Sequence, residues 1–158
     1  MPWFEDFAVG DRIAFGRYAV TRDEVVTFAG AYDPQPFHLD DAAAAKTHFK
    51  RLAASGWHSC AMTMAMVVAA QQARDAGEPD GGGALGAVGI DALRWLKPVY
   101  PGDVLRCETE VLEIKPSRSQ PHMGSVKSRL TVFNQDDEPV MTQEPIVLYR
   151  RRPQGGTG

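Results

Sequence analysis

The sequence predicts an α+β fold in which an antiparallel β-sheet packs on one long helix. Residues 56–73, GWHSCAMTMAMVVAAQQA, are apolar nearly all round until Gln71, which is typical of a helix buried on most of its sides. Residues 104–114 and 125–133 alternate apolar and polar side chains with the period of a strand that buries one face. We therefore expect the second half of the chain to form a sheet that wraps around the helix.

Length and composition predict a single domain. The 158 residues, of which 44% are hydrophobic, suit one core over residues 1–152 and a flexible tail at 153–158. The formal charge of −3 gives no general footprint for nucleic acid or an anionic membrane. Because the sequence shows neither a secretory signal nor an apolar run that spans a bilayer, we expect a cytoplasmic protein without a membrane partner. Cys60 and Cys107 are interpreted as reduced core residues, and with no zinc-type cluster the sequence predicts no metal or other cofactor.

The other elements follow from local signals along the chain. Residues 12–20 predict a first strand. Thr21 and Glu24 form a capping box that begins a helix, and Pro34 ends it because the residue before a proline avoids helical backbone angles. Residues 32–39 must then be extended or turned. We further expect a short helix at 41–48 capped by Asp40, the long helix capped by Ser55, a flexible loop at 76–83, and strands at 85–96, 104–114, 125–133 and 140–149, the last with a bulge or a sheet edge at Pro145.

The segment FAGAYDPQPFHLD, residues 28–40, is the candidate site. It places a carboxylate at Asp33 and an imidazole at His38, on a stretch stiffened by Pro34 and Pro36. One acid and one base on a short, stiff segment after a helix are typical of a site that activates water. Taken singly, Asp33 is better explained by a turn before Pro34, and His38 by a structural role.

The same segment resembles a known motif. The run DPQPFH, residues 33–38, resembles the D-x-N-P-x-H signature of the MaoC-like dehydratases, or R-specific enoyl-CoA hydratases. The stretches FEDFAVGDR, SGWHSCAMTMAM, LRWLKPVYPGD and VMTQEPIVLYRRR extend the resemblance over nearly the whole chain. The family's Asn is Gln35 in this chain, and its His-Gly pair at the start of the central helix is Ser55-Gly56, with His58 two residues later.

The resemblance implies a hotdog fold, a homodimer or a higher even homo-oligomer, and an acyl-CoA or acyl-carrier thioester as substrate. It favours catalytic roles for Asp33 and His38, which would together activate water for reversible addition to a trans-2-enoyl thioester. The backbone N–H of Gly56, at the start of a buried helix, would stabilise the thioester oxygen. A glycine that merely begins the helix is an equal alternative for this position.

Two other functions remain open at this point. The same fold and oxyanion donor suit a hotdog acyl-CoA thioesterase, which the substitution at Gln35 keeps in consideration. A non-catalytic acyl-CoA-binding protein is the third candidate, although a binder has no need of both Asp33 and His38. Basic side chains of this kind are usually solvated, but some could contact the phosphates of coenzyme A, and the sequence does not choose among the candidates Arg94, Lys97 and Arg150 to Arg152.

Overall fold

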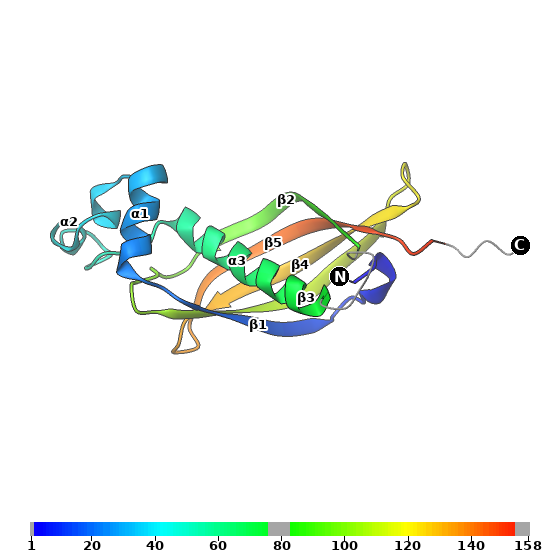
Figure 1. The fold of residues 1–158 in the computed structure, drawn as a ribbon, viewed down its shortest axis with the longest axis horizontal. Coiled ribbons are helices and arrows are strands. Elements are labelled where there is room, and N and C mark those ends of the chain that lie inside the picture. The colour runs from blue at the N-terminus through cyan, green and yellow to red at the C-terminus, as the bar shows by residue number, and fades with distance from the viewer. Residues whose placement is uncertain (1, 76–82, 154–158) are drawn as a thin grey trace, which may run out of the picture.

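The fold is a five-stranded antiparallel sheet with one long helix lying along it (Figure 1). The computed structural model describes residues 2–75 and 83–153. The sheet order is β1-β3-β4-β5-β2, which leaves β1 and β2 at the edges. The strands are β1 (Arg12–Ala19), β2 (Ala84–Trp95), β3 (Val104–Pro116), β4 (Met123–Phe133) and β5 (Pro139–Arg150); the helices are α1 (Arg22–Tyr32), α2 (Asp41–Ala45) and α3 (Gly56–Asp75), with short 3-10 turns η1 (Phe4–Asp6) and η2 (Pro36–His38). The predicted α+β fold class, with a curved sheet on a long central helix, is confirmed.

The core lies between α3 and the inner face of the sheet. Met62 and Met66 of α3 are buried there, and the sheet contributes Leu105, Cys107 and Val132. The alternation of apolar and polar residues in the sequence therefore correctly predicted which side chains lie on the inner face of the sheet. Helix α3 crosses β1 so closely that a Cβ atom on Gly16, where φ is +81°, would lie 2.8 Å from the sulfur of Met66.

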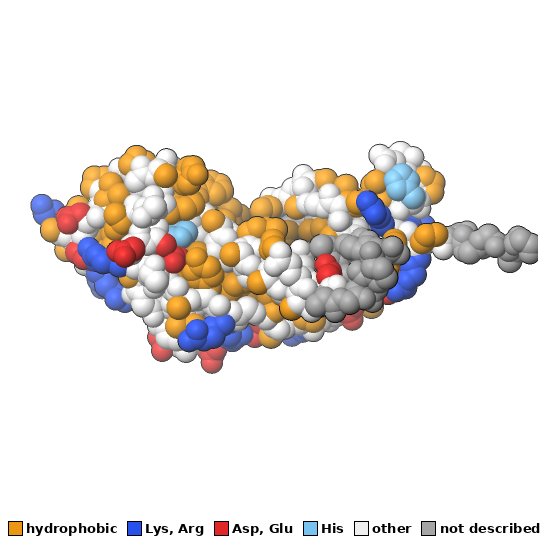
Figure 2. Space-filling model, viewed as in Figure 1, with side chains coloured by type: hydrophobic (Ala, Val, Ile, Leu, Met, Phe, Trp, Pro, Cys, Tyr) orange, Lys and Arg blue, Asp and Glu red, His pale blue; other side chains and the backbone are white. Residues whose placement is uncertain are grey.

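One side of α3 is exposed, so the expected burial on most sides is wrong for the single chain. Trp57 and Met64 are 59% and 55% exposed, and Val88 and Ile90 of the edge strand β2 are exposed as well. Figure 2, which looks onto α3, shows hydrophobic side chains across the middle of this face. The apolar pattern of a helix predicts how much of its surface is favourable to bury. It does not predict whether the same chain or a partner chain packs against that surface.

Several element boundaries also differ from the prediction. The short helix ends at Ala45 rather than at residue 48, although Asp40 does cap it by accepting a hydrogen bond from the N–H of Ala43. Strand β5 lies between β4 and β2, so the expectation of an edge at Pro145 is wrong. The register of β5 on β2 does shift on both sides of Pro145, as a bulge would require.

Apart from Gly83, the loop predicted at 76–83 lies outside the described residues, as does the tail beyond residue 153. No helix in the described part of the chain is long and apolar enough to cross a membrane.

Candidate active site

The candidate site forms where the end of α1 meets the start of α3. Helix α1 begins at its predicted cap, where Thr21 accepts a hydrogen bond from the N–H of Glu24, and it ends at Tyr32 before the two prolines. The chain then makes the 3-10 turn η2, whose last residue is His38. This path brings the two predicted side chains together, with Nε2 of His38 3.4 Å from Oδ2 of Asp33.

His38 is fixed in one orientation. It is 4% exposed, and its Nδ1 lies 2.7 Å from the carbonyl oxygen of Ala53. A carbonyl oxygen only accepts hydrogen bonds, so Nδ1 must carry a proton. In the neutral imidazole the lone pair is therefore on Nε2, the atom that faces Asp33.

Asp33 is held by two further side chains. The hydroxyl of Ser55 donates to Oδ2 at 2.7 Å, and the amide of Gln35 donates to Oδ1 at 2.7 Å. Burial raises the pKa of Asp33, but the hydrogen bonds from Gln35 and Ser55, together with the neighbouring His38, outweigh it and bring the pKa below its usual value. The carboxylate is therefore ionised at neutral pH.

The two departures from the family motif thus both contact Asp33. The sequence identified both residues as departures from the motif, and Ser55 also as a helix cap, but it predicted no contact of either residue with Asp33. Ser55 does cap α3, because its hydroxyl oxygen accepts from the N–H of Trp57 at 3.3 Å, but the same hydroxyl donates to Asp33. A serine hydroxyl can do both at once, and this double capacity next to the helix start was the signal available in the sequence.

Gly56 has a packing role that the sequence did not indicate. A Cβ atom at this position would lie 2.6 Å from the indole of Trp95, whose Nε1 donates to the carbonyl of Gly56 at 2.9 Å. Close approach of Trp95 therefore requires glycine here. The N–H of Gly56 belongs to the first turn of α3, where no intrahelical acceptor exists, and among the described residues we find no other acceptor for it.

A cleft of about 390 Å³ adjoins these residues. His38 and Gly56 stand on its wall together with buried Ser59, and Trp57 and Trp95 form an aromatic rim with their rings 5.3 Å apart. The remaining lining residues are His48, Phe49, Ala54, Leu96, Lys97, Pro98 and Val99. The cleft thus pairs an apolar wall with a few polar groups near the catalytic candidates, which is typical of a small-molecule site.

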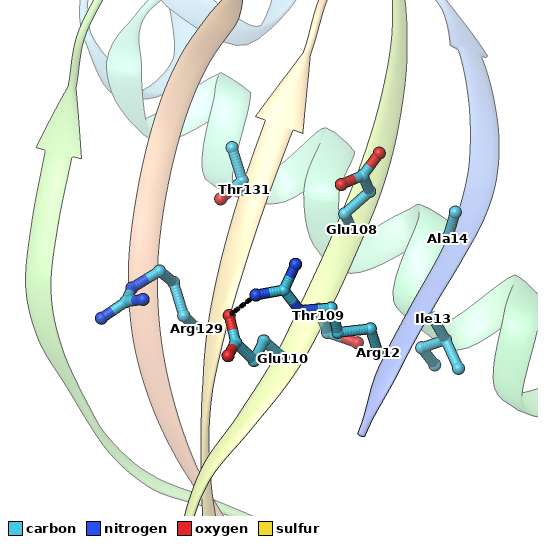
Figure 3. A pocket seen from close by; sticks show the side chains of 8 residues that line it. All are labelled: Arg12, Ile13, Ala14, Glu108, Thr109, Glu110, Arg129 and Thr131. Carbon is cyan, nitrogen blue, oxygen red and sulfur yellow. Dashed lines mark hydrogen bonds and ion pairs between the residues drawn. The ribbon is translucent and has the colours of Figure 1, made fainter. Parts of the chain in front are cut away.

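A second hollow, of about 190 Å³, lies on the opposite face of the sheet (Figure 3). Its charged residues Glu108 and Glu110 alternate along β3 with buried Cys107 and Val111, so they point away from α3. Arg12 pairs with Glu110 at 3.0 Å across the strands. The lining contains no imidazole or thiol, and we interpret it as a solvated charged surface.

His58 does not join the site. Its ring stacks on Phe28 of α1 at 4.6 Å, and its Nε2 lies 3.5 Å from Oε1 of Glu24. Burial lowers the pKa of His58, and the charge of Glu24 only partly opposes this. His58 is thus a neutral histidine that packs between α1 and α3. No cluster of three or more His, Cys, Asp or Glu side chains suited to a metal ion occurs within residues 2–75 and 83–153.

Comparisons with known proteins agree with this architecture. The structure is similar to the MaoC-like dehydratase of Rhodospirillum rubrum, with a TM-score of 0.83 and 42% identity over 96% of this chain and 99% of that one. The R-hydratase PhaJ1 of Pseudomonas aeruginosa is 28% identical with a TM-score of 0.65, over 99% of this chain and 96% of that one. Mesaconyl-CoA hydratase of Cereibacter sphaeroides is 39% identical over 69 residues, which are 44% of this chain and 20% of that protein.

The hotdog fold implied by the sequence motifs is confirmed by these structural neighbours. A family model described as the MaoC-like domain matches residues 6–134, more than three quarters of the chain. The protein is therefore a member of the MaoC-like domain family.

Proposed function

We propose that this protein is a hydratase/dehydratase that reversibly adds water to a trans-2-enoyl thioester. One observation carries the proposal: Oδ2 of Asp33 and Nε2 of His38 lie 3.4 Å apart beside an apolar cleft. In the neutral form of the His38 imidazole and the ionised form of Asp33, both atoms are hydrogen-bond acceptors. A water molecule has two O–H groups, so a single water can donate to both and is held with its oxygen lone pairs directed toward a substrate.

The low pKa of Asp33 assigns the two residues different tasks. A carboxylate that stays ionised is a weak base, so Asp33 orients the water and stabilises positive charge on His38. Nε2 of His38 takes the proton as the water oxygen bonds to C3 of the enoyl group and the C2–C3 π electrons move into the thioester. The same Nε2–H then protonates C2, so the substrate gains one water and the protein returns to its starting state. General acid–base help of this kind contributes about 10²- to 10⁴-fold to the rate.

The negative charge that develops on the thioester oxygen needs a donor. The N–H of Gly56 supplies it in our proposal, because it stands at the N-terminus of a 20-residue helix and on the wall of the cleft. A single oxyanion donor of this type contributes roughly 10²- to 10³-fold. In this arrangement the thioester carbonyl faces the start of α3 and the acyl chain continues along the helix.

The names of two relatives support hydration of a coenzyme A thioester: one is an R-hydratase and the other a mesaconyl-CoA hydratase. Lys97, at the cleft and paired with Glu138, is our candidate for a contact with a phosphate of coenzyme A or of an acyl-carrier group. Cys60 and Cys107 are both free, which fits a reducing cytoplasm as the proposed compartment.

We also propose that the working unit is a homodimer formed through β2 and the exposed side of α3. Strand β2 is a sheet edge, so one side of its backbone offers unpaired N–H and C=O groups. Val88 and Ile90 on this strand and Met64 on α3 are exposed apolar side chains. A second copy paired antiparallel along β2 would extend the sheet and cover both features.

The experiment that tests the activity follows the enoyl-thioester absorbance of crotonyl-CoA and the release of free thiol in the same samples. Loss of the enoyl band without thiol supports hydration. Thiol release instead would make the protein a thioesterase, and the absence of both signals over a series of acyl chains would favour a binding role. Asp33→Asn keeps the shape of the side chain and removes its charge, so undiminished hydration by this variant would refute the assignment of Asp33.

A further inference from the structure

One hydroxyl on the wall of the cleft has no role in the mechanism above. Ser59 of α3 is 4% exposed and lines the cleft together with His38 and Gly56. Its backbone groups are engaged, because its N–H donates to the carbonyl of Ser55 at 3.1 Å and its carbonyl accepts from the hydroxyl of Thr63 at 2.7 Å. Its own side-chain hydroxyl, in contrast, has no hydrogen-bond partner among the described residues.

This hydroxyl opens into the cleft rather than into the packed core. Within the described chain, the side-chain atoms that are both unpaired and closed off from solvent belong to Glu24, His58 and Gln143. Ser59 is not one of them, so its unpaired oxygen keeps some access to solvent although the residue as a whole is buried. Since Ser59 lines the cleft, the cleft is the space that this oxygen reaches.

The helix offers Ser59 another acceptor that it does not use. A serine or threonine within a helix often donates its hydroxyl to the carbonyl four residues earlier. Thr63 does this with the carbonyl of Ser59, one turn farther along α3. Ser59 does not do it with the carbonyl of Ser55, which accepts only the backbone N–H. Both the donor and the acceptor capacity of the Ser59 hydroxyl are therefore free for a group in the cleft.

Burial divides the lining of the cleft into a floor and a mouth. The floor consists of the buried lining residues, which are His38, Ala54, Ser59 and Val99. Trp57 and Trp95, at 59% and 46% exposed, belong to the mouth, as does exposed Lys97. In the proposed reaction the acyl carbons lie at the floor beside the base His38, and the carrier arm leaves through the mouth. Ser59 therefore lies beside the acyl group.

The spacing along α3 limits which part of the acyl group Ser59 meets. Ser59 follows Gly56 by three residues, a rise of about 4.5 Å. Helical side chains lean toward the N-terminus of their helix, which brings the hydroxyl back toward the turn that begins at Gly56. With the thioester oxygen at the N–H of Gly56, this separation spans only a few bonds of the substrate. The group that meets Ser59 is thus attached close to the reacting carbons.

We propose that Ser59 is a specificity residue that selects acyl groups with a hydroxyl on C4, the carbon next to the reacting C2–C3 pair. The inference rests on the proposed function, because it takes the thioester to lie at Gly56. A hydroxyl both donates and accepts, so it matches the free capacity of Ser59. An alkyl group at the same place would cover the Ser59 hydroxyl without giving it a partner, which weakens binding.

Charge makes a carboxylate the less suitable group on C4. Asp33 is ionised, and Ser55, which donates to it at 2.7 Å, lies one helical turn from Ser59. Lys97, which alone among the described lining residues is a lysine or arginine, is already paired with Glu138. A carboxylate beside Ser59 would therefore lie near a like charge without a free cation, whereas a neutral hydroxyl avoids this cost.

The test compares two substrates of the same shape. Trans-4-hydroxy-2-butenoyl-CoA carries a hydroxyl where trans-2-pentenoyl-CoA carries a methyl group, and both lose the enoyl absorbance on hydration. We expect Ser59→Ala to lower the ratio of kcat/KM for the hydroxylated over the alkyl substrate by on the order of 10- to 100-fold relative to the natural protein. The comparison between the two proteins cancels the intrinsic difference in reactivity of the two thioesters.

Thr63→Val is the matched control. It removes a hydroxyl one turn farther along α3 that is bonded to the backbone, so it should leave the ratio of the natural protein unchanged. Ser59→Cys is the second variant if alanine impairs folding. A thiol is only a weak hydrogen-bonding group, so this variant should also lower the ratio.

The other outcomes overturn the proposal. A ratio unchanged in Ser59→Ala and Ser59→Cys would show that the hydroxyl does not contact the substrate, while continued hydration of both substrates would leave the proposed function intact. A higher kcat/KM for the carboxylate analogue trans-3-carboxy-2-propenoyl-CoA than for the hydroxylated substrate would refute the choice of a neutral group. If neither these thioesters nor crotonyl-CoA is hydrated, the proposed function itself fails, and the role of Ser59 fails with it.

Discussion

Replacing Ser55 by alanine tests whether the hydroxyl holds the catalytic carboxylate or only begins a helix. The change removes two hydrogen bonds of one oxygen, the donation to Oδ2 of Asp33 at 2.7 Å and the acceptance from the N–H of Trp57 at 3.3 Å. Ser55 is fully buried, so water does not readily replace either bond. The two losses have different signatures because one concerns the ionised form of Asp33 and the other concerns α3.

The magnitudes follow from the two bonds. Loss of a helix cap lowers the free energy of unfolding by about 1 kcal/mol. A hydrogen bond to a charged group is worth about 1.5–3 kcal/mol, so misplacement of Asp33 should lower kcat/KM for enoyl-CoA by roughly 10- to 100-fold. The Ser55 bond also favours the ionised carboxylate, so its loss raises the pKa of Asp33 and the protonated form of Asp33, which cannot hold the water, becomes populated at a higher pH.

The assay combines a pH–rate profile of hydration with urea unfolding of the same preparations. Thr21→Ala is the matched control, because Thr21 caps α1 through the N–H of Glu24 and has no bond to Asp33. We expect this control to lose stability with little change in kcat/KM. If Ser55→Ala loses stability but keeps its rate within about twofold at every pH, Ser55 is a cap alone and our account of Asp33 is wrong.

Three further predictions follow from the packing. Gly56→Ala should destabilise the fold by about 1–3 kcal/mol in urea unfolding, because its Cβ would meet Trp95 at 2.6 Å; unchanged stability would contradict the close packing. Since burial holds the pKa of His58 below the 6.5 of the unfolded chain, the unfolded state takes up this proton first, and the free energy of unfolding should fall as the pH drops below about 6.5. His58→Phe should flatten this dependence, which urea titrations on both sides of that pH will measure. Val88→Lys should convert the proposed dimer to a monomer in light scattering, whereas Glu110→Lys on the outer face should not; a monomeric natural protein would exclude the dimer.

The sequence predicted those features that depend on local pattern. The apolar stretch from Gly56 and the alternation around Cys107 predicted the layers, and the proline-flanked segment predicted that Asp33 and His38 are neighbours. These signals lie within a few residues of one another, so periodicity and backbone restriction are enough to interpret them.

What the sequence did not predict depends on contacts between distant segments. Ser55 is 22 residues from Asp33, and the indole of Trp95 reaches Gly56 from 39 residues away. Neither contact has a local signature. The exposure of Met64 was also missed, because hydrophobicity does not distinguish a surface that this chain covers from one that a partner covers.

The four residues 53–56 have a consequence for how the site tolerates change. The carbonyl of Ala53 fixes His38, the hydroxyl of Ser55 fixes Asp33, and the next N–H, that of Gly56, is the proposed oxyanion donor. The N–H of Ala54 anchors this tetrapeptide to the carbonyl of Val99 at 2.8 Å. A displacement of α3 would therefore carry the base, the carboxylate and the oxyanion donor along together and preserve their mutual geometry. Substitutions in the distant core should accordingly alter the fit of the acyl chain before they alter the alignment of the reacting groups.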